Sequence, residues 1–445
     1  LVLTIGMAVD TNVIIFERIK DELNHGKGYQ LAISDGYRRS LPPVLDGHIT
    51  TMLTAIILFY FGLGPILGFA TTQILGILLS LFCGILISRL ITDVWTNKKR
   101  HFEYFTGVSK KVFRHAAYKF VEYRKIAYII SVIVLIGCIG SLFNGFDEGV
   151  EYKGGRSYTV RFDNPVKNDD VRLSLEKSFG ENPVIKTVGD NKTLNITTSY
   201  LIDNSSKSAD SLVEVALYQG LKSNLPANIS FFDFQKTYKQ SSQTVQASIS
   251  DDLKKGAVKA TIFALLVIFI YILLRFRDWR YSLGTIVALL HDVFVTLIVF
   301  SFLKGIVPFP LEIDQHFIAA VLTVIGFSMN DTVIVFDRIR EYSRNLIGKS
   351  KTEIVNAAIN DTLSRTIMTS LTVFLTLLIL FIFGGEVTRG FAFAMLIGVI
   401  TGTYSSIFVA APILVDLAKD RPLGTPSDMT QPAAKSTSKV TPKTT

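Results

Sequence analysis

The 445-residue chain has only two cysteines, Cys83 and Cys138, and both lie within apolar runs. We expect no disulfide between them, and neither belongs to a spacing typical of a metal centre. The sequence also lacks the glycine-rich phosphate loop that ends in Lys-Ser or Lys-Thr, and it lacks a nucleophile elbow. We therefore expect no metal, no cofactor and no enzyme activity. Without an ATPase motif, any work has to come from an ion gradient or from a partner.

Charge is also sparse, since only 19% of the residues are Asp, Glu, Lys or Arg. Globular domains contain roughly 25% charged residues. The mean hydropathy is +0.38, which over this length requires long apolar segments. The runs 260–274 and 366–383 are close to membrane-spanning length and almost uncharged. These features exclude a disordered chain and an ordinary soluble enzyme, and they indicate a polytopic α-helical membrane protein.

The remaining charges are biased toward basic residues, with a net charge of +9 and an isoelectric point near 9.3. In a soluble protein this balance favours nucleic-acid binding, but the sequence contains no RNA- or DNA-binding motif. Most Lys and Arg residues instead stand in loops between apolar spans, as the positive-inside rule predicts. We therefore expect contact with a lipid bilayer and no nucleic acid as a partner.

The apolar runs predict about nine membrane spans. They lie near 1–16, 48–62, 68–91, 126–145, 256–274, 282–303, 317–336, 366–383 and 390–418. Threading the chain through these spans places four basic segments on one side, which we assign to the cytoplasm: 17–47, 95–125, 275–280 and 338–364. The opposite loops, 62–67, 304–316 and 384–389, contain few Lys or Arg residues. The charges are therefore consistent with one orientation along the whole chain.

One large polar insert, about 146–252, falls on the non-cytoplasmic side. Its patterns predict a strand, a helix, a hairpin, a helix and a strand, which is the order of a ferredoxin-like α+β fold. These elements are expected at 156–162, 168–179, 184–198 (turning at Gly189-Asp190-Asn191), 212–221 and 229–234. The polar segment 240–255 is expected to be a helix that continues into the next span.

The strongest pattern is an internal repeat with a spacing of about 320 residues. The segment IGMAVDTNVIIFERIK at 5–20 matches IGFSMNDTVIVFDRIR at 325–340. Further matches follow in both copies: Phe61-Gly62 with Phe383-Gly384, 68–70 with 390–392, and Gly76 with Gly398. Both copies cross in the same direction, which predicts a parallel repeat about an axis along the membrane normal. The first copy lacks the upstream spans of the second, so we expect the C-terminal part of a longer protein.

The two copies resemble the signatures of the SecD/SecF family of protein-export membrane proteins. GMAVDTNVIIFERIKDEL is similar to the SecD signature, FSMNDTVIVFDRIRE is similar to the SecF signature, and their order resembles a fused SecDF chain. GVEYKGGRSYTVRF at 149–162 resembles the start of the SecF periplasmic domain, with Glu151 and Tyr152 where Asp and Phe are more usual. The resemblance covers about 1–93 and 120–418.

This resemblance implies a domain order and a function. The order is SecD-like C-terminal spans (1–93), a basic cytoplasmic linker (94–125), a first SecF-like span (126–145), a periplasmic α+β domain (146–252), a five-span SecF-like bundle (253–418) and a disordered cytoplasmic tail (419–445). The implied function is an accessory subunit of the Sec translocon in the bacterial cytoplasmic (inner) membrane. It would use the proton motive force to promote export of unfolded polypeptides. Its implied partners are the SecYEG channel, other translocon accessory proteins and the exported polypeptide.

Ionisable groups within the apolar spans are the most informative residues, because each costs roughly 2.5–3.5 kcal/mol at the centre of a membrane helix. Asp10, Asp331 and Arg365 lie at similar expected depths near the cytoplasmic side, so we expect them to meet between helices. Six polar neighbours are expected as hydrogen-bond partners: Thr11, Asn12, Asn330, Thr332, Ser364 and Thr369. A guanidinium that approaches and leaves Asp331 would make this acid release and take up a proton in turn. The resemblance implies the same three positions as the proton path.

Structural roles are the alternative for these residues. Asp10 or Arg365 alone fits a helix-end charge that reaches the interface, or an interhelical ion pair. The intramembrane pair His291-Asp292 fits either a proton relay or a hydrogen bond to a neighbouring span.

The remaining polar residues near the spans are assigned as follows. Asp46 stands near the repeat-equivalent of Arg365, so an acid replaces a base there, and His48 is expected to be an interfacial residue. Glu17-Arg18 and Asp337-Arg338 are expected to form cytoplasmic ion pairs that anchor the repeats.

Two other functions also fit the repeat and the buried charges. One is an exporter of small molecules or lipids related to the proton-driven RND family, and the other is a stabiliser of the translocon that transports nothing. Protons are the expected coupling ion, with sodium as the alternative.

Overall fold

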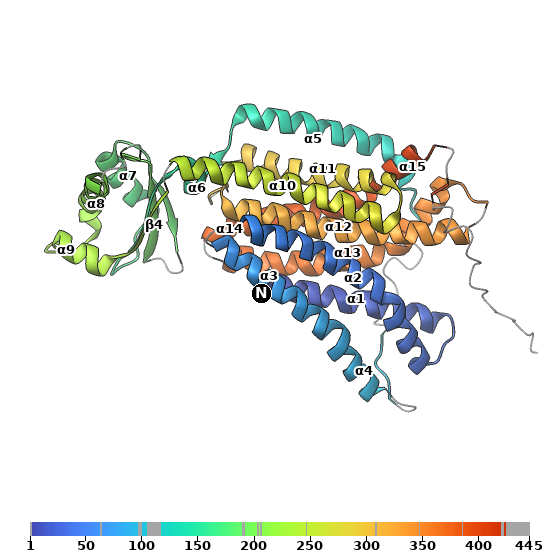
Figure 1. The fold of residues 1–445 in the computed structure, drawn as a ribbon. Coiled ribbons are helices and arrows are strands. Elements are labelled where there is room, and N and C mark those ends of the chain that lie inside the picture. Colours follow the sequence, from blue (N-terminus) through green and yellow to red (C-terminus); the bar gives the residue numbers. More distant parts are fainter. Residues whose placement is uncertain are drawn as a thin grey trace, which may run out of the picture.

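The computed structural model describes residues 2–62, 65–96, 100–104, 117–188, 192–202, 204, 207–245, 247–307, 309–346, 348–384, 386–419 and 422–423. Long helices lie side by side in a bundle, and a small domain with a β-sheet stands at one end of it (Figure 1). Eight helices in these described ranges are long and apolar enough to cross a membrane, against about nine expected spans, and the helix that contains the expected span 1–16 is not among them. The expected polytopic helical fold with a small α+β domain is therefore confirmed.

The two copies of the repeat form matching sets of helices. The first copy is α1 (Val2–Asn24), α2 (Tyr29–Phe61) and α3 (Pro65–Leu81), which continues through the π-helical η1 (Phe82–Ile87) into α4 (Ser88–Trp95). The second is α12 (Gln315–Asn345), α13 (Lys351–Phe383) and α14 (Glu386–Ser405), which continues through the π-helical η5 (Ser406–Ala410) into α15 (Ala411–Ala418). Three more long helices precede the second copy: α5 (Arg124–Asn144), which follows the short turn η2 (Val121–Tyr123), α10 (Ala247–Phe276) and α11 (Trp279–Leu303).

Tertiary contacts repeat along with the sequence. Gly62 and Gly384 end α2 and α13, and their N–H groups donate to the carbonyls four residues earlier at 2.7 and 2.8 Å. A Cβ atom at Gly76 would lie 2.1 Å from Thr4, and one at Gly398 would lie 2.2 Å from Val324. Thr4 and Val324 occupy equivalent positions, so the same close helix crossing is built twice.

Two helices extend far beyond the predicted spans. The spans expected at 48–62 and 366–383 are the ends of α2 and α13, which begin at Tyr29 and Lys351. Most of the expected basic loops 17–47 and 338–364 is therefore helical. Apolar composition reports only the part of a helix that lies in lipid, and a polar helix end continues with the same hydrogen bonding. A capping box between Ser350 and Glu353 begins α13 well outside its apolar part.

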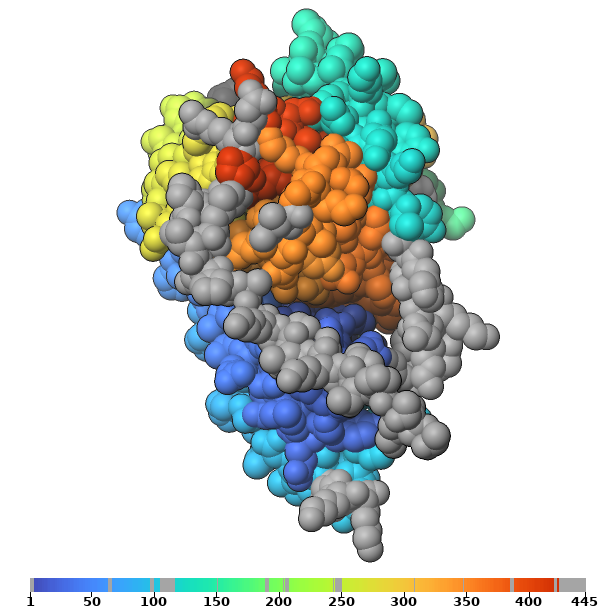
Figure 2. All heavy atoms as spheres, turned by 90° about the vertical axis from the view of Figure 1, so that its right-hand side faces the viewer, coloured from blue at the N-terminus to red at the C-terminus, as the bar shows by residue number. Residues whose placement is uncertain are grey.

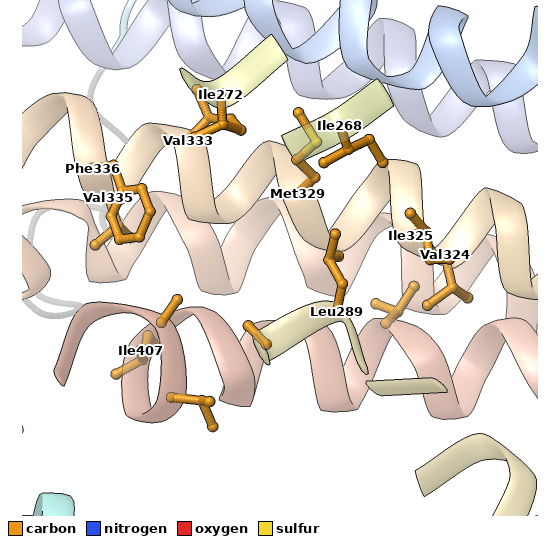
Figure 3. Packing of buried hydrophobic residues seen from close by; sticks show 14 of the residues in the cluster. Ile268, Ile272, Leu289, Val324, Ile325, Met329, Val333, Val335, Phe336 and Ile407 are labelled. Carbon is orange, nitrogen blue, oxygen red and sulfur yellow. The ribbon is translucent and has the colours of Figure 1, made fainter. Parts of the chain in front are cut away.

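The core is built around α12. In its most apolar part 83% of the residues are buried, against 17% for α5. Met329 and Val333 of α12 pack in one cluster with Ile268 and Ile272 of α10 and with Leu289 of α11 (Figure 3). Because α12 is enclosed by other helices, the polar side chains that it carries face protein rather than lipid.

The extramembrane domain has the expected ferredoxin-like order. Its elements are β2 (Gly155–Arg161), α7 (Asn168–Phe179), β3 (Val184–Thr187), β4 (Thr193–Thr198), α8 (Lys207–Leu221) with the turn η3 (Lys222–Asn224), and β5 (Lys239–Val245). The sheet order is β3-β4-β2-β5, and all neighbouring strands are antiparallel. Tyr158 and Leu194 from the sheet pack with Leu175 and Leu217 from the helices. The expected turn residues 189–191 lie outside the described residues.

The last strand of this domain was placed incorrectly from the sequence. Residues 229–234 do not form a strand; α9 (Phe231–Asp233) runs into the π-helical η4 (Phe234–Tyr238), and Phe234 is fully buried in the core. The strand is β5, which lies at the sheet edge, and the expected helix at 240–255 begins only with α10. The Gln-Ser-Ser-Gln-Thr run of β5 has no apolar alternation, so hydrophobic periodicity does not detect it.

The domain is attached to the N-terminal end of α12. The short strands β1 (Asp147–Glu148) and β6 (Glu312–Ile313) pair in parallel beside the one-turn helix α6 (Val150–Lys153). The ammonium of Lys186 in β3 lies 2.7 Å from the carboxylate of Glu312, and these side chains are only 18% and 10% exposed. Burial acts to lower the pKa of Lys186, but the carboxylates of Glu312 and Asp314 outweigh it and raise this pKa above its ordinary value. Lys186 therefore stays protonated in this contact.

Parts of the linker and of the tail lie outside the described residues, namely 97–99, 105–116, 420–421 and 424–445. The described end of the linker packs on α13, where the N–H groups of Tyr118 and Val121 donate to Asn360 and Asn356. In the expected disordered tail, the carbonyl oxygens of Pro422 and Leu423 accept hydrogen bonds from Arg280 and Tyr281.

Candidate functional site

The two copies meet through a hydrogen bond between equivalent residues. Asn330 of α12 donates to the carboxylate of Asp10 in α1 at 3.0 Å, and both side chains are 9% exposed. The two residues are 320 positions apart, so they occupy the same place in the two copies. Gly47 of α2 leaves the space for this contact, because a Cβ atom there would lie 2.2 Å from Asn330 Oδ1. This bond therefore lies where the two copies face each other.

Asp331 lies next to this bond and makes a separate contact. Its side chain is 8% exposed, and its carboxyl accepts a hydrogen bond from Ser370 of α13 at 3.2 Å. Thr403 of α14 donates to the same Ser370 hydroxyl at 2.7 Å. Of the six polar neighbours expected as partners, Asn330 bonds to one of the acids, whereas Ser370 was not foreseen. Only packing shows which polar face of α13 turns toward Asp331.

Arg365 lies close to both acids without an ion pair. It is within electrostatic range of Asp10 and Asp331. Its Nε and Nη2 atoms are buried and have no hydrogen-bond partner in the described part of the chain. The expected meeting of Asp10, Asp331 and Arg365 is thus found as a group of neighbours in which the guanidinium is free to approach either carboxyl.

Two cavities lie near the charged residues, one lined by Arg365 and the other by the two acids. One of about 970 Å³ lies at the basic end of the bundle between the copies, and its lining includes Arg18, Arg338, Asp361 and Arg365. Figure 2 looks onto this end, where the blue surface of α1 and α2 lies beside the orange surface of α12 and α13. A small cavity of about 30 Å³ is lined by Asp10, Asn330, Asp331, Thr369 and Ser370. It exceeds the 10–15 Å³ or so that one water needs, so the two acids share a space large enough for a water molecule.

The pair His291-Asp292 belongs to a different cluster on α11. Asp292 is 0% exposed, and one of its oxygens accepts from Ser328 of α12 at 2.6 Å and from Ser405 of α14 at 2.8 Å. His291 Nδ1 lies 3.5 Å from the other oxygen. Ser328 also lines the small cavity, so this cluster adjoins the acids without containing them.

Asp46 is paired with a helix that the sequence did not connect to it. Its carboxylate accepts from Tyr271 at 2.8 Å and contacts the Arg275 guanidinium at 2.7 Å, and both partners lie on α10. Arg275 also lies 3.4 Å from Asp337. The acid that stands near the repeat-equivalent of Arg365 is therefore neutralised by a base from outside the repeat.

Three expectations about neighbouring polar residues were wrong. Arg18 does not pair with Glu17 but lies 3.8 Å from Asp21 and 3.9 Å from Glu22. Arg338 does not pair with Asp337 but contacts Asp361 at 2.7 Å and Asp21 of the other copy at 3.9 Å. The side chains of these adjacent residues point in different directions from the helix, so each base finds an acid elsewhere.

The third wrong expectation concerns His48, which was expected to lie at the membrane interface. It is only 5% exposed and lies between three helices.

Comparison with known proteins places this arrangement in a family. The family described as "Protein export membrane protein SecD/SecF, C-terminal" matches residues 1–98 and 228–420. The chain is 43% identical to the protein translocase subunit SecF of Rhodothermus marinus, over 69% of this chain and 95% of that protein. It is 33% identical to the SecDF subunit of Brucella abortus over 93% of this chain and 52% of that protein. The chain thus spans about half the length of its SecDF relatives.

Solved structures agree with the sequence comparison. The crystal structure of SecDF from Thermus thermophilus, described as a translocon-associated membrane protein, superposes with a TM-score of 0.77 at 32% identity. The superposed part is 94% of this chain and 54% of the Thermus thermophilus chain. A SecDF structure in a super-membrane-facing form superposes with a TM-score of 0.69 at 31% identity. The chain belongs to the SecD/SecF family of protein export membrane proteins.

Proposed function

We propose that this chain is part of an accessory subunit of the Sec translocon that uses the proton motive force to promote export of polypeptides. Its relatives are named protein translocase subunits, and one structural relative is described as translocon-associated. The Sec channel, its other accessory proteins and the exported polypeptide are the proposed partners. The proposed location is the bacterial cytoplasmic membrane, with the sheet-containing domain on the periplasmic side.

The observation that carries the proposal is that Arg365 lines the large cavity and lies within electrostatic range of two buried acids that line the small one. A proton that reaches Asp331 from the small cavity neutralises its carboxyl, and the Arg365 guanidinium is then attracted mainly to Asp10. When Arg365 moves toward Asp331, the carboxyl releases the proton toward the large cavity and becomes an ion-pair partner. Each proton that crosses 100 mV provides about 2.3 kcal/mol, which is enough to bias two arrangements of the helices.

The proposed path consists of Asp10, Asp331 and Arg365, and the attachment of α12 connects it to the domain. Asp331 lies on α12, and the same helix begins directly after β6, which pairs with β1 and contacts Lys186. A shift of α12 on proton binding therefore displaces the base of the domain. The cluster of Asp292 and His291 joins α11, α12 and α14, and we assign it to holding these helices together.

The test is the replacement of Asp331 by Asn, which has nearly the same shape but binds no proton. We expect the variant to assemble normally and to lose the part of secretory-protein export that depends on the proton gradient, measured in membrane vesicles. Asp93→Asn is the control, because Asp93 is exposed on α4 beside Arg89.

Normal export by Asp331→Asn contradicts proton coupling at this site. Export that is lost together with assembly favours a purely structural role. Export that depends on a sodium gradient, measured when no proton gradient is present, identifies sodium as the coupling ion.

A further inference from the structure

The first copy contains a polar contact that corresponds to the contact of Asp331. The register that aligns Asp10 with Asn330 aligns Thr11 with Asp331, and the register that aligns Gly62 with Gly384 aligns His48 with Ser370. In the second copy Ser370 bonds to Asp331 at 3.2 Å, and in the first His48 Nε2 lies 3.4 Å from the Thr11 hydroxyl. In the second copy the titratable side chain, Asp331, lies on the first helix of the repeat and the hydroxyl lies on the second helix. In the first copy the hydroxyl lies on the first helix and the titratable side chain, His48, lies on the second.

His48 is enclosed by three helices of the first copy. It lies on α2, contacts Thr11 of α1, and has Nε2 3.0 Å from the Ser80 hydroxyl of α3. Its Nδ1 atom lies 2.8 Å from the carbonyl oxygen of Val44, one turn earlier on α2. Every described polar contact of the ring is therefore with an uncharged group.

The hydrogen-bond directions limit where protons can be. The Val44 carbonyl only accepts, so Nδ1 carries a proton. The Ser80 and Thr11 hydroxyls each have one hydrogen, and the carbonyls of Ile77 at 2.8 Å and Met7 at 3.1 Å can accept them. When both hydrogens are used in this way, Nε2 can only donate a hydrogen bond, and this arrangement requires the doubly protonated imidazolium.

The neutral ring is also compatible with this site. When Nε2 loses its proton, the Ser80 hydroxyl turns from the Ile77 carbonyl to donate to the bare nitrogen. When Nε2 takes up a proton, the new N–H donates to Ser80, whose hydrogen returns to Ile77. Rotation of one hydroxyl therefore keeps every ring nitrogen bonded in both states, and no buried ring nitrogen loses its partner.

The charged groups on the neighbouring helices make contacts of their own. On α2, Asp46 is bound by Arg275 and Tyr271. On α1, one oxygen of Asp10 accepts from Asn330, and the other has no partner in the described part of the chain. The group that faces His48 from α3 is the uncharged Ser80. No carboxylate therefore stabilises the cationic ring, and a proton on Nε2 is held weakly enough to be released again.

We infer that His48 is a proton-binding site of the first repeat, placed where the second repeat has the Asp331–Ser370 contact. This inference deepens the proposed function and rests on it for the role of the proton, but the binding itself does not depend on export. Each copy then holds one exchangeable proton at an equivalent place. The charges of the two sites differ, because a proton neutralises the Asp331 carboxylate but makes the His48 ring cationic.

The direct test is nitrogen NMR of ring-labelled histidine in the unmodified chain in lipid nanodiscs, with His48 assigned by its absence in His48→Asn. Spectra are recorded from neutral pH down to the lowest pH at which the protein stays folded, and we expect His48 to change from the Nδ1–H neutral form to the imidazolium within this range. A ring that keeps one state throughout this range overturns the inference. Because the measurement uses the native sequence, poor folding of a variant does not affect it.

The functional test compares the pH profile of gradient-driven export in two variants. His48→Ser, which restores the residue of the second copy, is expected to shift the pH midpoint, whereas His25→Ser on the exposed α1–α2 turn is expected to leave it unchanged. An unchanged profile in His48→Ser, together with loss of export in Asp331→Asn, refutes the site while the proposed function stands. A titrating His48 together with normal export by Asp331→Asn supports the site and refutes the proposed function.

Discussion

At the scale of single residues, three buried acids of the membrane helices each have a hydrogen-bond partner on another helix. Asp10 has Asn330, Asp331 has Ser370, and Asp292 has two serines. A hydrogen bond to a charged group contributes about 1.5–3 kcal/mol, and a buried acceptor left alone costs a similar amount. Some buried atoms have no hydrogen-bond partner in the described residues, among them one oxygen of Asp10 and the Nε and Nη2 atoms of Arg365. Because Arg365 and Asp10 lie within electrostatic range of each other, these atoms can become partners when the guanidinium moves.

Gly47→Ala tests the contact between the two copies. The added methyl would lie 2.2 Å from Asn330 Oδ1, so Asn330 has to leave Asp10. We expect a loss of about 1–3 kcal/mol in stability from overpacking, together with reduced gradient-driven export. Stability is measured by thermal unfolding of the purified protein.

Gly68→Ala is the matched control, because nothing lies within 4 Å of its added Cβ and the residue is exposed on α3. It should be neutral or gain roughly 0.5–1 kcal/mol from helix propensity. Equal effects of both substitutions would show that the Asn330 contact is not responsible.

Asp292→Asn separates a structural role from proton relay. The amide oxygen still accepts from Ser328 and Ser405, so we expect near-normal stability and export. Asp292→Leu removes the acceptor and should cost about 1–3 kcal/mol in stability. Export that fails in Asp292→Asn while thermal stability is kept would instead make Asp292 part of the proton path.

At the scale of helices and strands, α12 connects the two working parts of the protein. It is the most enclosed membrane helix, it carries Asn330 and Asp331, and its N-terminus is capped by Asp314, whose carboxylate accepts from the Phe317 N–H at 2.7 Å. The strand β6 just before this cap attaches the domain through β1 and Lys186. A rigid helix with these two attachments transmits an axial shift from the acids to the domain.

Charge reversal tests this attachment. Lys186→Glu places two carboxylates in a mostly buried contact, and breaking such a pair costs on the order of 3–5 kcal/mol. We expect a broader distance distribution between spin labels at Ser223 in the domain and Lys304 in the bundle, and lower export. Glu312→Lys, when combined with Lys186→Glu, should restore both the narrow distance distribution and the normal level of export.

Arg172→Glu is the control for charge reversal in the same domain. Arg172 pairs with Asp169 on the exposed side of α7, where ion pairs contribute about 0–1 kcal/mol. A double reversal at 186 and 312 that fails to restore the narrow distribution would contradict the proposed coupling.

At the scale of the whole molecule, the basic segments that connect the membrane helices and the inserted domain lie at opposite ends of the bundle. The turns after α1, α10 and α12 lie at one end, and the domain stands at the other (Figure 1). The positive-inside rule assigns the basic end to the cytoplasm. In the proposed function the large cavity therefore opens to the cytoplasm, and the domain lies on the opposite side of the membrane.

Cysteine labelling tests this orientation. In a Cys83→Ser background, Ser223→Cys should react with an impermeant reagent added to cells with a permeabilised outer membrane, because Ser223 is exposed on the domain. Gly26→Cys, on the exposed turn between α1 and α2, should react only after the inner membrane is opened. The opposite pattern, or a cytoplasmic reporter at Lys222, would invert the map and the direction of proton flow.

Local composition was sufficient for the spans, the repeat and the ferredoxin-like order of the domain. Apolar length, charge sidedness and self-similarity are properties of short segments, so they can be read without knowing what each segment touches. The same applies to Asp10, Asp331 and Arg365, which stand out because ionisable residues are costly in lipid. Composition failed at β5, a polar edge strand without alternation, and at the polar helical ends of α2 and α13.

The sequence by itself therefore determined the class of the protein, its family and the residues that have to be neutralised inside the membrane. Only the tertiary structure decided the partners. Asp10 bonds to Asn330 across 320 residues, Asp46 bonds to α10 outside the repeat, and His48 is buried where the second copy has Ser370. The physical reason is that a polar side chain in a membrane protein takes the nearest group that packing presents. That choice depends on helix crossings, such as those at Gly47 and Gly76, that bring together residues far apart in the chain.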